Sequence, residues 1–161
     1  MNRADRLRGR VRLRVSDSEG SLVAERRSEN VVVKRGAEIV AGLLSGAASA
    51  ARINRLQLGF GRESVGVEAT SLTPPADDAI PAAALQGVIP PESFTVQTDR
   101  PDVLQLLITT DFSPSVELSD VSEAGLMAGD ALYNQVVFEP ITLRVGQDIT
   151  FFWEVDLPYG R

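Results

Sequence analysis

The chain has 161 residues, of which 43% are hydrophobic and 24% are charged, and its net charge is −6 at pH 7. A chain of this size and composition can bury the core of one globular domain without covalent staples. The absence of cysteine and histidine excludes disulfides, thiolate metal sites and the histidine base of a Ser-His-Asp hydrolase. No stretch approaches the ~20 apolar residues of a membrane span. The basic start MNRADRLRGR leads into no apolar segment, so we expect no secretory signal and synthesis in the cytoplasm.

The N-terminal segment alternates arginine with apolar residues. Residues 8–15 read RGRVRLRV, and this period of two predicts a half-buried strand. The turn DSEG follows, and the pattern resumes at Leu22, which predicts a β-hairpin over about 9–28. Charge is split along the chain: residues 1–35 carry ten basic and five acidic side chains, whereas residues 36–161 carry six basic and seventeen acidic ones. The basic hairpin is therefore expected to meet something acidic.

Three interpretations of the arginine row stay open. The row can be a solvated strand face that also protects a sheet edge. It can be a docking surface for an acidic neighbouring protein. Nucleic-acid binding is the third and is not expected, because no aromatic residues are interleaved for base stacking and the rest of the chain is acidic. The candidate interface residues are Arg8, Arg10, Arg12 and Arg14.

The middle of the chain contains one helical pattern. Ile39, Val40, Leu43 and Leu44 have helical spacing, and Gly46 is a suitable stop, so we expect a helix over 36–45. Residues 53–60 alternate as a strand and lead into the stretch LGFGRESVG, which matches no phosphate-binding glycine motif. We therefore expect no nucleotide cofactor.

The second half of the chain is rich in strand patterns. The region 73–91 contains five prolines and predicts a long excursion from the domain. Short strands are possible at 82–88 and 94–97. Longer strands are predicted over 103–112, 131–139 (with 141–145 continuing it or forming a neighbour) and 149–157. Closely spaced strands with one helix predict a single all-β domain over 1–161, mainly an antiparallel β-sandwich or flattened barrel.

Carboxylates gather in sequence between the last predicted strands. Glu117, Asp120, Glu123 and Asp130 could in principle serve glycoside hydrolysis or bind a hard cation. The spacing does not match an EF-hand, and Trp153 is the only tryptophan available as a sugar platform. We therefore expect no catalytic residue, no metal, no cofactor and no small-molecule substrate.

Four residues are instead expected to have structural roles. The run Glu123-Ala-Gly125 predicts a compact turn, in which Glu123 caps local backbone N–H groups and Gly125 supplies a conformation that a side chain would obstruct. Leu126 is expected to point into the sandwich. Trp153, on an alternating strand, is expected in the core with a partner for its indole N–H.

Four segments, taken in order, resemble small virion structural proteins of tailed bacteriophages and related contractile injection systems. They are 30–44 (NVVV followed by IVAGLL), 53–72 (INRLQLGFG followed by ATSL), 121–141 (VSEAGL followed by LYNQVVFEPI) and 146–155 (GQDITFFWEV). The resemblance implies a non-enzymatic component of a tail, baseplate, neck or fibre attachment, located in the virion. It implies assembly with copies of itself and with other virion proteins. A head-decoration protein or a receptor- or carbohydrate-binding sandwich is the alternative.

Overall fold

A computed structural model describes residues 8–63 and 66–159. The fold is mainly antiparallel β-structure with one short α-helix, which confirms the predicted fold class. The described residues form nine strands, one α-helix and two 3-10 helices. In chain order they are β1 (Arg8–Ser16), β2 (Leu22–Val32), α1 (Lys34–Ser45), β3 (Arg55–Gly59), η1 (Ala82–Leu85), β4 (Gln86–Val88), η2 (Pro91–Ser93), β5 (Phe94–Arg100), β6 (Val103–Phe112), β7 (Leu118–Ala128), β8 (Ala131–Leu143) and β9 (Asp148–Pro158).

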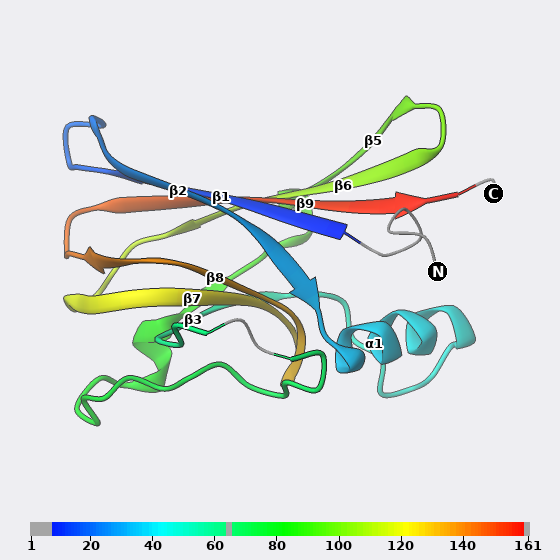
Figure 1. The fold of residues 1–161 in the computed structure, drawn as a ribbon, viewed down its shortest axis with the longest axis horizontal. Coiled ribbons are helices and arrows are strands. Elements are labelled where there is room, and N and C mark those ends of the chain that lie inside the picture. Colours follow the sequence, from blue (N-terminus) through cyan, green and yellow to red (C-terminus); the bar gives the residue numbers. More distant parts are fainter. Residues whose placement is uncertain (1–7, 64–65, 160–161) are drawn as a thin grey trace.

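The strands form one curled sheet in the order β4-β3-β7-β8-β2-β1-β9-β6-β5. The curl produces two layers, which Figure 1 shows one above the other. We call the layer of β5, β6, β9, β1 and residues 22–30 of β2 the β1 sheet. We call the layer of β8, β7, β3, β4 and the end of β2 the β7 sheet. β2 joins the two layers, because it pairs with β1 up to Asn30 and with β8 only at Val31 and Val32.

The main core lies between the two layers. The alternation seen in the sequence places Val11, Leu13 and Val15 of β1 inward, opposite Trp153, Phe151 and Ile149 of β9. Trp153 is fully buried, and its ring centroid lies 6.4 Å from that of Phe151. Its indole N–H has no hydrogen-bond partner in the described part of the chain, whereas a partner was expected from the sequence.

The outer face of the β7 sheet is covered as well. Residues 60–63 and 66–85 pass over it, and a second apolar cluster forms there from Val33, Leu72, Met127 and Leu132. Every residue of β7 from Val121 to Ala128 is buried as a consequence. A strand covered on both faces has no polar and apolar alternation in its sequence.

The expected turn at Glu123-Ala-Gly125 was therefore wrong, because these residues lie in the middle of β7. Gly125 is needed for a different reason from a turn conformation. A Cβ added there would lie 2.8 Å from the carbonyl oxygen of Asn134 and 2.8 Å from Cδ1 of Leu132. The neighbouring strand β8 thus comes too close for a side chain at this position.

α1 begins at Lys34, two residues before the expected start, and ends at Ser45 as expected. Gly46 follows in the left-handed conformation (φ 71°) and its N–H bonds to the Gly42 carbonyl, which is a common helix termination. The first half packs against β8, whereas the second half extends beyond the sheet (Figure 1). Leu43 and Leu44 there are 51% and 86% exposed.

Candidate functional site

The arginine row lies on the outer face of the β1 sheet. β1 is an interior strand between β2 and β9, so the interpretation that the row protects a sheet edge is wrong. Arg10, Arg12 and Arg14 face outward, because the residues between them fill the core. Arg8 is the first residue of β1, but its side chain lies outside the described part of the structure.

The described arginines find partners on the neighbouring strands. The Arg10 guanidinium lies 2.8 Å from a Glu154 carboxylate oxygen on β9. Arg14 lies 3.8 Å from Glu25 on β2, and the same carboxylate is 2.8 Å from Arg27. These pairs are exposed, so each contributes little to stability, but together they offset much of the positive charge of the row.

Arg12 differs from its neighbours. Its guanidinium carbon lies 4.5 Å from the ring centroid of Phe152, a distance typical of a cation–π contact. It forms no ion pair with a carboxylate in residues 8–63 or 66–159. The N–H groups at the edge of its guanidinium can therefore donate hydrogen bonds to a carboxylate from outside the chain.

A shallow hollow of about 480 Å³ surrounds Arg12. It lies over β2, β1 and β9, and both signs of charge are present around it. Its lining residues are Arg10, Val11, Arg12, Arg27, Ser28, Glu29, Phe152 and Glu154. A mixed ionic surface of this kind suits a polar contact with another protein.

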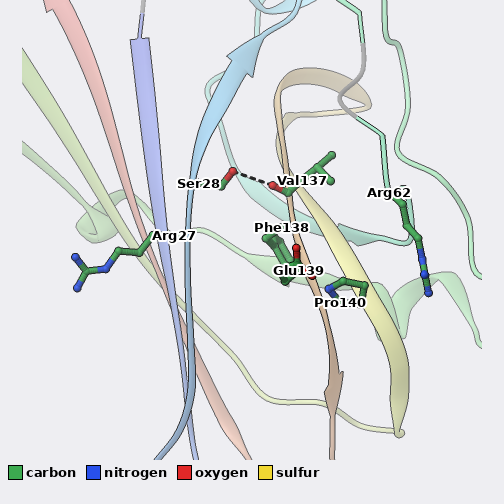
Figure 2. Close-up of a pocket in the computed structure, with 7 residues that line it drawn as sticks. All are labelled: Arg27, Ser28, Arg62, Val137, Phe138, Glu139 and Pro140. Carbon is green, nitrogen blue, oxygen red and sulfur yellow. Dashed lines mark hydrogen bonds between the residues drawn. The ribbon is translucent and has the colours of Figure 1, made fainter.

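A second hollow of about 470 Å³ lies at the junction of β2 and β8 (Figure 2). The Ser28 hydroxyl donates a hydrogen bond to the Val137 carbonyl at 2.8 Å, and Arg26 Nε donates to the Glu139 carbonyl at 3.2 Å. Side chains of β2 thus continue the contact with β8 where the backbone ladder has ended. Arg27 and Arg62 point away from each other on opposite sides of this hollow, so they do not converge on one ligand.

Glu123 is the most enclosed carboxylate of the predicted group, with no exposed surface. Its Oε2 accepts hydrogen bonds from the backbone N–H of Thr73 at 2.7 Å and of Gly61 at 3.1 Å. The neighbouring Ser122 hydroxyl donates to the Gly61 carbonyl at 2.8 Å. The N–H groups that Glu123 caps are therefore distant from it in sequence, whereas local ones were expected. They belong to the segment that covers the β7 sheet.

The other three carboxylates lie apart from Glu123. Glu117 is 3.5 Å from Arg144, Asp120 is 3.6 Å from Arg62, and Asp130 is 3.4 Å from Arg55. Each is exposed and has its own arginine. The described residues contain no group of three acidic, histidine or cysteine side chains that could hold a metal ion. The structure therefore does not bring the sequence cluster together into one site.

Sequence reasoning missed the partners of the arginine row. Phe152 and Glu154 were visible as one face of an alternating strand, opposite Phe151 and Trp153. No local pattern indicated that β9 pairs with β1, and this pairing sets Arg10 opposite Glu154 and Arg12 opposite Phe152.

Comparison with protein-family models gave no match, and comparisons with curated proteins and with solved structures gave none either. In the described part of the chain, no helix combines the length and apolar character that crossing a membrane requires.

Proposed function

We propose that this chain is a non-enzymatic structural component of a tailed-phage virion, of the tail, baseplate, neck or fibre-attachment type. In this proposal it assembles through repeated contacts with copies of itself and with other virion proteins. The first support is the ordered set of four sequence motifs. The first motif forms the end of β2 and α1, and the last forms most of β9.

The observation that carries the proposal is the exposed apolar end of α1. Leu43 lies on the same side of the helix as Ile39, which is buried against the sheet, yet the helix continues past the sheet and leaves Leu43 half exposed. Leu44, one residue later, is almost fully exposed. Large apolar side chains exposed next to one another on a helix are typical of surfaces that another protein covers.

The distribution of carboxylates and arginines also favours assembly over chemistry. The one enclosed carboxylate, among those that the sequence singled out, binds backbone N–H groups. The exposed ones form separate ion pairs. The sequence contains no histidine, and the four carboxylates that it singled out do not converge with a base in the described part of the chain. This arrangement suits contacts with other proteins better than acid–base chemistry.

Replacement of Leu44 by serine tests the proposal. We expect the intact chain to form a multimer by light scattering, and Leu44→Ser to lower its mean mass at the same concentration. Because Leu44 is exposed, the free energy of unfolding should change by less than about 0.5 kcal/mol. Val145→Ser is the matched control, since Val145 is also exposed (64%) but lies in the turn between β8 and β9. A wild-type chain that stays monomeric at every concentration would speak against the proposal.

The alternative, a carbohydrate-binding module, has less support. Sugar rings stack on free aromatic faces, but Arg12 already covers Phe152 on the outer face of the β1 sheet. A glycan array tests this alternative, and a specific, saturable signal there would favour it over assembly.

A further inference from the structure

β5 ends the strand order of the sheet and is bonded to a neighbour on one side only, by its pairing with β6. Residues 95–100 of this strand are all exposed. An edge strand of this kind presents a row of backbone N–H and C=O groups to any other strand. The opposite edge of the sheet, β4, has only three residues and offers a much shorter row.

The first five residues of β5 lack the usual protection of an edge, whereas Asp99, Arg100 and an irregular register lie toward its far end. Phe94 to Thr98 reads FTVQT and contains no charge and no proline. Proteins commonly blunt such edges with lysine, proline or inward-pointing charges. Val96, at the centre of this stretch, is 56% exposed although it is on the same side of the sheet as the core.

We infer that β5 pairs with β5 of a second copy of this chain, in an antiparallel arrangement about a two-fold axis at Val96. In this register Val96 faces Val96 of the second copy, and Phe94 faces Thr98. The side chains on the core side of the two β5 strands therefore form a mainly apolar strip across the joint. On the outer side Thr95 faces Gln97, and these two side chains can hydrogen-bond.

Charge supports this choice of partner. An antiparallel pair sets the beginning of one β5 beside the end of the other, so Glu92, in η2 just before β5, lies at the same end of the joint as Arg100 of the second copy. Glu92 is exposed and forms no ion pair within the described residues. Arg100 is exposed and lies 3.6 Å from Asp156, so it can also meet an acid from outside. The two-fold arrangement makes each such contact twice.

A register shifted by one residue is less favourable. A two-fold axis at Gln97 would set Val96 opposite Thr98 and Thr95 opposite Asp99, which gives no apolar pair on the core side. An axis at Thr95 would set Phe94 opposite Val96, but it would set Gln97 opposite Ser93, which lies in η2 and not in β5. The axis at Val96 therefore combines an apolar pair on the core side with partners that all lie within β5. This inference is separate from the proposed function in its residues, although both expect contacts between copies.

The absence of natural cysteine allows a direct test with a single introduced thiol. Val96→Cys would place two thiols opposite each other across the axis, where antiparallel strands have Cα atoms about 4.5–5.5 Å apart, within disulfide range. We expect a covalent dimer on mild oxidation, formed at least about tenfold faster than by Val145→Cys, because pairing raises the effective thiol concentration. Equal rates for the two variants would overturn the inference.

Val96→Lys supplies a second readout. Two like charges opposite each other should repel, so we expect the dimer fraction at a fixed concentration to fall about tenfold or more, and Val145→Lys to leave it unchanged. An unchanged dimer with Val96→Lys would contradict the two-fold pairing. The two proposals fail differently: a multimer that does not cross-link through residue 96 overturns the β5 pairing alone. A cross-linked dimer that is absent from virions overturns the virion role alone.

Discussion

The Glu123 carboxylate accepts a hydrogen bond from the backbone N–H of Thr73 at 2.7 Å, across a sequence separation of 50 residues. The same oxygen accepts the N–H of Gly61. One buried side chain of β7 thus holds the segment that leaves β3 and passes over the β7 sheet at two points, Gly61 and Thr73. This arrangement explains why the centre of β7 is buried on both faces.

Loss of this carboxylate should therefore destabilise the fold. Glu123→Ala would leave the backbone N–H groups of Gly61 and Thr73 without their acceptor and open a cavity where the buried side chain was. We therefore expect about 2–4 kcal/mol lower free energy of unfolding in urea. Hydrogen exchange should become faster at Gly61 and Thr73 in particular. Glu117→Ala is the control, because that side chain is exposed. A change below about 0.5 kcal/mol for Glu123→Ala would mean that Glu123 does not hold the segment.

Asp120 has a positive φ of 60° within β7, next to an irregularity in its pairing with β8. Glycine adopts this conformation freely, whereas a β-branched residue does not. We expect Asp120→Gly to be more stable than Asp120→Val by about 1–2 kcal/mol. Both variants lose the ion pair with Arg62, so the difference between them reports the cost of the backbone conformation at residue 120. The same pair of substitutions at Ser119, an exposed strand position, should give the opposite order, and a matching order at both sites would refute the explanation.

Gly36 is buried where α1 meets β8, and an added Cβ would overlap the Tyr133 carbonyl oxygen. Alanine normally favours a helix over glycine by about 1 kcal/mol. Here we expect Gly36→Ala to lower the thermal midpoint, because a backbone atom cannot move aside as a side chain can. Gly66→Ala, where no atom lies near the added Cβ, should leave the midpoint unchanged or slightly higher. Stabilisation by Gly36→Ala would show that α1 is free to move away from β8.

Burial raises the pKa of the Tyr133 phenol above its ordinary value of 10.0. The folded state therefore favours the neutral phenol, and its contribution to stability is intact below pH 10 and is lost as the pH rises through the raised pKa. Above pH 10 the free energy of unfolding of the wild type should fall by up to about 1.4 kcal/mol per pH unit because of this group. Tyr133→Phe should remove that part of the dependence of unfolding free energy on pH, as measured by denaturation curves at a series of pH values from about 8 to about 11.5. Tyr159→Phe, at an exposed position, should retain it, and identical slopes for all three proteins would contradict the assignment.

Patterns along the sequence were sufficient for much of the fold. The predicted strand at 103–112 coincides with β6, and the predicted helix differs from α1 by two residues at one end. β8 runs through Pro140 to Leu143. The proline is accommodated because the pairing of β7 with β8 is irregular opposite it.

The rest depended on contacts between distant segments. β7 was missed because residues 60–63 and 66–85 cover its outer face, which removes the alternation that marks a strand. Likewise, the role of Glu123 follows from the position of Gly61 and Thr73. No local sequence pattern indicates that those N–H groups lie beside Glu123. They reach it only because the covering segment folds back over β7.

The central claim is that this chain is a repeated structural part of a virion. Its most direct test is mass spectrometry of phage or injection particles purified from cells that produce this chain, with quantification against a major tail protein. The account predicts that the chain is present in a fixed, multiple copy number and withstands extensive washing of the particles. Its absence from the particles, together with recovery only as free protein in the cell extract, would contradict the claim.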